Sequence, residues 1–241
     1  MALPKLETPT YELSLPSTNE SIKFRPFLVK EQKILYMAQN SKNDSEMTNS
    51  IGELVKNCTF NKIDPLQSPM FDIEYIFLKL RSKSIGSEVE MNVLCPDDNK
   101  TRVPIKINLD DVDVQMTTGH TNEVMLTEKM KLVLRYPILK DMGNIEGDTE
   151  VDRVFNILVK CIHEIHDGDK IYNAVDVTKN ELITFVEQMT SGQLNLVMEF
   201  FEGMPKLRHV IQVTNPKTKK KGEVVVEGLQ SFLGECYLTI V

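Results

Sequence analysis

The chain has 241 residues, of which 41% are hydrophobic and 26% charged, and this ordinary globular balance excludes disordered, collagenous and fibrous proteins. It carries 28 Lys and Arg against 35 Asp and Glu, and the resulting net charge of -7 argues against nucleic acid or an anionic membrane as its partner. The first residues predict no secretory signal, and no window approaches the roughly 18 apolar residues that a membrane-spanning helix needs. The four widely spaced cysteines predict reduced thiols in a cytoplasm.

The first half of the chain alternates between hairpin and helix patterns. Apolar residues recur with a period of two in strands and near 3.6 in helices, and turn residues separate the segments. In chain order the patterns predict a hairpin within 1–28, helices at 29–39, 44–57 and 70–83, a hairpin at 89–109 and strands at 124–127 and 130–136. We expect the third helix to be buried centrally because it is apolar on all sides. The strands between 85 and 136 predict one small antiparallel sheet.

The second half is mainly helical and closes with another hairpin. The expected elements are helices at 151–165, 178–189 and 193–202, a hairpin at 211–226 and a short helix at 229–233. The second of these helices opens with a capping box, Thr178 and Glu181. The fold class is therefore predicted to be α+β, with alternating helical segments and antiparallel hairpins and no parallel βαβ sheet. We divide the chain into an N-terminal α+β region, 1–136, and a C-terminal helical region with a terminal hairpin, 137–241.

The best candidate for chemistry is the stretch 161–169, which gathers Cys161, His163 and His166 among acidic residues. A zinc protease needs two histidines four residues apart on a helix, whereas His163 and His166 are three apart and no third ligand is indicated. A cationic imidazole near a helix C-terminus is a sufficient structural explanation. Two catalytic alternatives stay open, a metal site using these histidines and a nucleophilic Cys161 with His163 or a remote histidine as base.

No other catalytic or cofactor-binding motif is present. The sequence contains no GxSxG, GxxxxGK[ST] or GxGxxG pattern, and no carboxylate pair stands out from the other acidic residues. We therefore predict no enzyme, no cofactor, no metal and no small-molecule substrate.

Two segments are candidates for binding a protein partner. The lysines of 217–221, among them Lys219 and Lys220, lie at a predicted hairpin tip with no interleaved aromatic residue, which favours a protein contact over nucleic acid. The segment 200–207 is more apolar than one helix stripe requires, and it is either core or a contact surface. Our candidate partner-binding residues are Phe200, Phe201, Met204, Pro205, Leu207, Lys219 and Lys220.

Several segments, taken in order, resemble the baseplate hub assembly proteins of T-even-type contractile-tailed bacteriophages. They are LPKLETPTY at 3–11, KFRPFLVKE at 23–31, LRSKSIG at 80–86, FFEGMPKL at 200–207, NPKT at 215–218 and VEGLQSF at 226–232. The resemblance implies a non-enzymatic phage protein that builds the central hub of the tail baseplate by contacting other hub or tail proteins. It would act in the cytoplasm of the infected host, as an assembly factor that leaves or as a subunit that stays in the tail.

The resemblance also bears on zinc. Some members of the family look cysteine-rich at hairpin turns of this kind, as if binding zinc. In this chain the middle hairpin keeps only Cys95 followed by Pro96, and the last hairpin has no cysteine. We therefore expect no zinc site here, and expect the hairpins to be held by their apolar faces and turns.

Overall fold

The computed structural model describes residues 6–41, 44–143, 147 and 149–233, and the chain divides into two compact units. Unit 1 consists of Met1–Gln115 and Lys206–Val241, and unit 2 of Met116–Pro205. The boundary predicted at residue 136 falls inside unit 2. The predicted division separates strands that pair with each other, and sequence periodicity does not show which strands pair.

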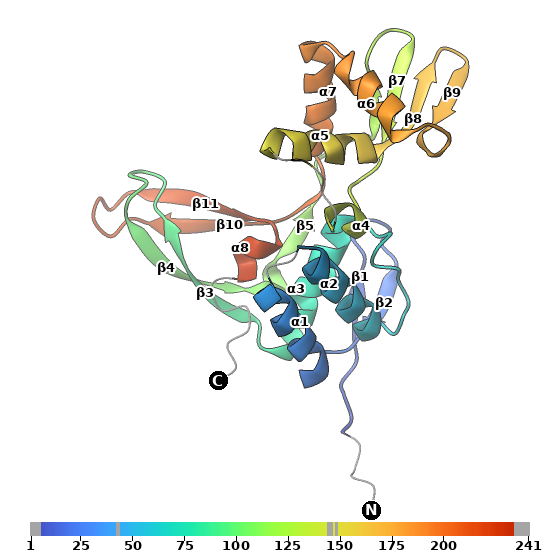
Figure 1. Ribbon diagram of the computed structural model, residues 1–241. Coiled ribbons are helices and arrows are strands. Elements are labelled where there is room, and N and C mark those ends of the chain that lie inside the picture. Colours follow the sequence, from blue (N-terminus) through green and yellow to red (C-terminus); the bar gives the residue numbers. More distant parts are fainter. Residues whose placement is uncertain (1–5, 42–43, 144–146, 148, 234–241) are drawn as a thin grey trace, which may run out of the picture. The chain divides into compact units, whose positions relative to one another are not determined.

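Unit 1 opens with a hairpin and three helices, shown in Figure 1. Their bounds are β1 Tyr11–Ser14, β2 Ser21–Phe24, α1 Val29–Ser41, α2 Asp44–Cys58 and α3 Met70–Ser84. Helix α3 is the centre of the unit, as predicted, and it buries side chains on all sides, including Ile73, Ile76, Leu78 and Leu80. A helix that buries side chains on every face lies inside a core, and the polar groups that α3 buries with them, such as Asp72 and Lys79, are hydrogen-bonded.

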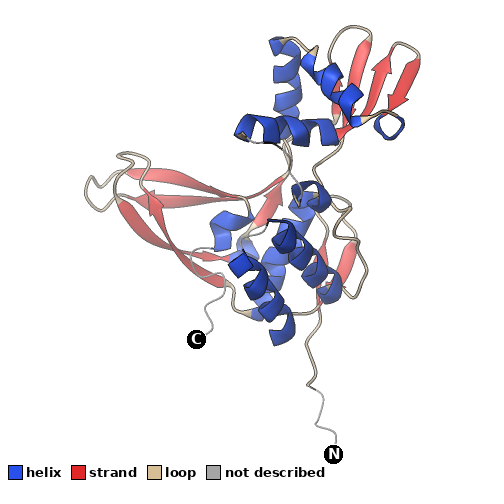
Figure 2. Cartoon of the chain, in the orientation of Figure 1, coloured by secondary structure: helices blue, strands red, loops and turns tan. Residues whose placement is uncertain are grey.

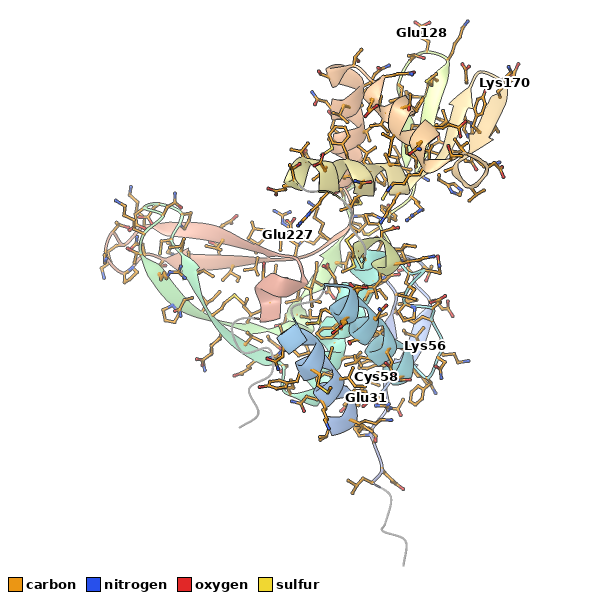
Figure 3. The ribbon with its side chains drawn as sticks, in the orientation of Figure 1. Glu31, Lys56, Cys58, Glu128, Lys170 and Glu227 are labelled. Carbon is orange, nitrogen blue, oxygen red and sulfur yellow. The ribbon has the colours of Figure 1, made fainter. Side chains whose placement is uncertain are left out.

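Ion pairs and hydrogen bonds join the first elements of unit 1. The Arg25 guanidinium lies 2.9 Å from the Glu31 carboxylate and 3.8 Å from the Cys58 sulfur. Figure 3 labels Glu31 on α1 and Cys58 at the end of α2. Burial opposes the charge of Glu31, but the hydrogen bonds from Arg25 and from the backbone of Leu28 outweigh it and lower the pKa of Glu31. The entry to α1 is thereby fixed to the end of α2.

Unit 1 also contains two long hairpins, and we call them together the arm. The first is β3 Glu88–Leu94 with β4 Arg102–Asn108, and the second is β10 Lys206–Thr214 with β11 Lys221–Glu227. Figure 1 shows the two hairpins side by side. Strand β5, Asp113–Gln115, pairs with the start of β10 and gives the order β11-β10-β5, and α8, Leu229–Leu233, follows and packs on α3 and β11.

A buried lysine fixes the base of the arm to α3. Lys79 donates to the carbonyls of Asp110 at 2.9 Å, Val112 at 3.0 Å and Leu109 at 3.3 Å. These carbonyls belong to the short 3-10 helix η1, Leu109–Asp111, and the residue after it. Because burying an ammonium group without partners is costly, the three acceptors explain why a lysine is tolerated here. Because these carbonyls directly precede β5, the contact fixes where β5 begins, and β5 in turn pairs with β10.

Unit 2 is a four-stranded antiparallel sheet with helices. Its elements are β6 Glu123–Met125, β7 Met130–Leu134, α4 Leu139–Met142, α5 Glu150–Cys161, β8 Ile162–Asp167, β9 Lys170–Asn173, η2 Ala174–Asp176, α6 Lys179–Glu187 and α7 Ser191–Glu202. The strand order is β6-β7-β8-β9. The core joins sheet residues such as Leu132 and Leu134 to helix residues such as Leu158, Val186 and Val197. The predicted capping box of Thr178 and Glu181 is confirmed at the start of α6.

The predicted α+β class is confirmed, since helices and small antiparallel sheets alternate along the described chain (Figure 2). Two local predictions are wrong. The helix expected at 151–165 ends at Cys161, and β8 follows at once. Ile162 and Ile165 continue the helical spacing, but they pack as strand residues against β7. The strands between 85 and 136 do not form one sheet, because β3 and β4 pair only with each other while β6 and β7 join β8 and β9.

A candidate partner-binding surface at the tip of the arm

Three hairpins of unit 1 are closed by the same turn, at 15–20, 95–100 and 215–220. In each turn the second residue is proline, and the fifth donates its backbone N–H to the carbonyl of the first, at 2.8, 2.9 and 2.9 Å. The fifth residue has a positive φ in every case: Asn19 at 60°, Asn99 at 50° and Lys219 at 63°. Asparagine tolerates this left-handed conformation better than most residues, whereas lysine adopts it at a cost.

The turns of the two arm hairpins contact one another. The amide nitrogen of Asn215 donates to a carboxylate oxygen of Asp97 at 2.9 Å and to one of Asp98 at 3.0 Å. The Thr218 hydroxyl donates to the other oxygen of Asp97 at 2.5 Å. Asn215 is only 1% exposed, so its amide is removed from water and fully engaged. We call the group formed by Asp97, Asp98, Asn215 and Thr218 the clasp.

A tight backbone approach accompanies the clasp. A Cβ atom placed on Gly222 would lie 2.5 Å from Cγ of Pro96, closer than real atoms approach. The φ of Gly222 is not in the left-handed region, so backbone conformation does not require glycine here. The close approach of Pro96 requires it, because that approach leaves no room for a side chain. The proline of one turn therefore packs directly on the strand that leaves the other turn.

The residues of the two tips do not fit a zinc ion. The turn positions with the spacing of a zinc knuckle hold Cys95 and Asp98 on one hairpin and Asn215 and Thr218 on the other. Amide and hydroxyl groups are not zinc ligands of this kind. Burial, and then the carboxylates of Asp97 and Asp98, raise the pKa of Cys95, which disfavours the thiolate that binds metal. Within the described part of the chain, no group of three His, Cys, Asp or Glu residues is placed to hold a metal ion.

Lysines surround the clasp. The lysines of the two turns and the one that begins β11 are all exposed: Lys100, Lys217, Lys219, Lys220 and Lys221. The two aspartates nearby are occupied by the clasp, and the structure gives none of these lysines an ion pair among the described residues. The tip is therefore a cationic surface on an acidic protein, and it includes the predicted Lys219 and Lys220.

The other candidate residues lie in a different environment. Phe200 is 3% exposed and belongs to the core of unit 2, where its ring stacks on His120 and Tyr136 at 5.0 and 5.7 Å. Leu207 is fully buried in unit 1. Pro205 is also buried, and Phe201 and Met204 are half-buried against the core of unit 2. Of the candidate residues, Lys219 and Lys220 are therefore the ones that the described chain leaves open to a partner.

The arrangement of Cys161, His163 and His166 does not support a catalytic site. The pairing of β8 with β7 is irregular at His163, and Nε2 of His163 lies 3.7 Å from a carboxylate oxygen of Glu164. His166 is paired with Glu164 through a 2.7 Å contact between Nε2 and Oε2. Cys161 is fully buried, and burial raises the pKa of its thiol to about 12, so the thiol is protonated at neutral pH.

Sequence reasoning missed the clasp, although one signal was available. The proline-containing turns at 95–100 and 215–220 share their spacing, and that similarity indicates that they have the same shape. It does not indicate that they meet, because Asn215 and Asp97 are 118 positions apart. The hairpin β8–β9 had a clearer signal, the Asp167-Gly168 pair, which is typical of a tight hairpin turn and here has Gly168 at a φ of 59°.

The fold and this surface together define a class: an α+β protein whose described residues contain no metal cluster and which presents a charged hairpin tip. No helix within the described ranges combines the length and hydropathy needed to cross a bilayer. The family model described as T4 bacteriophage base plate protein matches residues 8–234, and the chain therefore belongs to that family. No curated protein and no solved structure matches the chain.

Proposed function

We propose that this protein acts without catalysis in the assembly of the central hub of the phage baseplate, through contacts with other hub or tail proteins. The observation that carries the proposal is the family match, which spans 8–234 and so includes both units. Several segments, taken in their order along the chain, resemble baseplate hub assembly proteins, and this resemblance supports the hub as the place where the protein acts. The protein would work in the cytoplasm of the infected host, and the tail baseplate is its destination if it is retained.

The tip of the arm is the contact surface that we propose. Its exposed lysines stand out on a chain with a net charge of -7, so an acidic patch on a partner would be attracted to this point rather than to the rest of the molecule. Nucleic acid is a poorer match, because the net charge repels phosphate and no aromatic residue lies among the lysines of 217–221.

Unit 2 offers a second, apolar place for contact. A recess of about 320 Å³ lies between α5 and α6 and is lined by Val151, Phe155, Val159, Ile183 and Val186. Val151 is 64% exposed beside it. Exposed apolar side chains around a recess are typical of protein contact surfaces, so this feature supports binding to proteins.

The proposal has two forms, a retained hub subunit and an assembly factor that leaves, and they predict different compositions of the mature particle. A retained subunit buries a permanent interface of about 2,000 Å² or more, whereas an assembly factor binds transiently and leaves. Quantitative mass spectrometry of purified tails and of infected-cell lysate separates them. A fixed stoichiometry in tails indicates a subunit, and abundance in the lysate alone indicates a factor that leaves. Absence from tails together with no association with hub proteins in the lysate would overturn the proposal.

A charge-reversal experiment tests the tip. The double variant Lys219→Glu with Lys220→Glu should reduce co-purification of hub proteins from infected cells by about tenfold or more, because two attractive charges become repulsive. The matched control reverses two exposed hairpin lysines of unit 2, Lys129→Glu with Lys170→Glu, and Figure 3 labels Lys170 at its turn. Equal losses in both double variants would show that net charge, and not the tip, governs binding.

A further inference from the structure

We infer that direct hydrogen bonds between side chains of this one chain, the clasp of Asn215 and Thr218 with Asp97 and Asp98, join the two hairpin tips. The clasp takes the place of a metal ion that would otherwise join them. The inference concerns how the arm is held, and it stands whether or not the protein serves the hub. It follows from the disagreement between the zinc that the family resemblance suggests and the residues that this chain carries.

The Asn215 side chain forms hydrogen bonds through both its amide oxygen and its amide nitrogen. Its amide oxygen accepts from the backbone N–H groups of Lys217 at 2.9 Å and Thr218 at 3.3 Å, within its own turn. Its amide nitrogen is therefore directed to the opposite turn, where it donates to Asp97 and Asp98. An amide satisfies both roles because it has an acceptor and two donors, whereas a carboxylate would place oxygen against oxygen.

The acceptors on the opposite turn are equally well placed. Asp98 accepts from the backbone N–H groups of Lys100 and Thr101, both at 2.9 Å, and from the Thr101 hydroxyl at 2.6 Å. These local bonds orient the carboxylate from within its own turn, and its remaining acceptor capacity faces Asn215. Asp97 accepts mainly from Thr218 and Asn215 across the contact, and its own backbone N–H is the smallest of the contributions that lower its pKa. Asp98 is thus held chiefly by its own turn, and Asp97 chiefly by the opposite turn.

Both turns are shaped before they meet. They share the proline and the left-handed fifth residue of the hairpin at 15–20, where the same turn lies against α3 through a hydrogen bond from the Ser17 backbone N–H to Asp72. The turn geometry therefore does not depend on the clasp, and the clasp joins two preformed parts. A metal would have to displace this hydrogen-bond network and would find Cys95 as the sole thiol at the tips.

Hydrogen exchange of the full-length protein, followed by mass spectrometry, tests the inference. The variant Thr218→Val removes the donor but keeps the shape, and it should speed exchange in β3, β4, β10 and β11 by about tenfold, the equivalent of one lost hydrogen bond to a charged acceptor. Thr18→Val changes the equivalent residue of the first hairpin, where Thr18 contacts only its own turn, and should leave the arm unchanged. Thr218→Ser retains the hydroxyl and should restore slow exchange.

Metal dependence is measured on the same protein. We expect no stoichiometric zinc in the purified protein and no change of arm exchange when a strong chelator is added. Stoichiometric zinc together with faster arm exchange after chelation would overturn the inference, as would unchanged exchange in both Thr218→Val and Asn215→Ala. If Asn215→Ala fails to fold, Thr218→Val alone decides the matter, because its side chain is exposed and its loss leaves the cores intact.

Discussion

The sheet of unit 2 and the arm of unit 1 bury their strands in different ways. In unit 2, helices contribute to a continuous apolar core in which Leu132 and Leu134 are 0% and 1% exposed. In the arm, inward positions near the ends, such as Val213, are buried, but those midway, such as Met91 and Ile211, are only half-buried. The sheet is therefore stabilised mainly by apolar burial, whereas the arm also depends on polar and steric contacts at its tips.

The largest expected effect is on the sheet. Leu132→Ala should lower the free energy of unfolding of unit 2 by about 2 to 5 kcal/mol, because it leaves a cavity in a closed core. Chemical denaturation followed by circular dichroism measures it. Val175→Ala is the control, since Val175 is 89% exposed and its truncation should have little effect. Similar losses in both variants would contradict the view that core burial sustains unit 2.

A steric change at the tips should lower the stability of the arm, by less than the cavity lowers that of unit 2. Gly222→Ala places a methyl group against Pro96, and forcing the tips apart should cost about 1 to 3 kcal/mol. Thermal unfolding and exchange in the arm measure this cost. Gly192→Ala is the control, because the nearest atom to a Cβ there is 4.0 Å away and the residue lies in helix α7. Adding Pro96→Ala to Gly222→Ala should recover part of the loss, and a double variant no better than the single would contradict the contact.

Acid should weaken the tip of the arm. Hydrogen bonds from Thr218 and then Asn215 lower the pKa of Asp97, and those from Thr101 lower the pKa of Asp98. A carboxylate with a lowered folded-state pKa stabilises the fold above its unfolded value of about 3.9, and that stabilisation is lost as the pH falls through the folded value. Asp97→Asn should therefore melt earlier than the unsubstituted protein at pH 7, and the difference should shrink toward pH 3. A constant difference across this range would argue against an ionised clasp.

The smallest effect concerns one backbone angle. Lys219→Asn should raise stability by up to about 1 kcal/mol, because asparagine accepts the left-handed φ of 63° that Lys219 adopts. Lys220→Asn removes the same charge without that benefit and serves as the control. If both variants shift the melting temperature equally, charge and not conformation is responsible.

Local pattern predicted much of this fold. The apolar helix at 70–84, the capping box of Thr178 and Glu181 and the turns around Pro96 and Pro216 all depend on neighbouring residues, and the structure contains them. The prediction failed where two apolar residues three positions apart continue a helical spacing, as Ile162 and Ile165 do, because pairing with β7 makes this segment a strand. The strands β5 and β9 are too short for their alternation to be recognised.

The candidate site was predictable only in its charge. Lys219 and Lys220 were expected at an exposed hairpin tip, and they lie there. The apolar pattern of segment 200–207 favours core over contact surface, and tertiary packing buries Phe200 and Leu207. The clasp depends on residues that are far apart in sequence and individually unremarkable, so composition and periodicity carry no trace of it.

Because β5 pairs with β10, unit 2 is an insertion that can be removed or replaced. Gln115, the last residue of unit 1 before unit 2, is the cross-strand partner of Lys206, the first residue after it. Two chain ends that already face each other across an antiparallel ladder can be joined by a two-residue turn such as Asn-Gly. A shortened chain lacking 116–205 should therefore close as an ordinary hairpin. The same junction offers a place where another domain could be exchanged for unit 2 without disturbing the register of the arm.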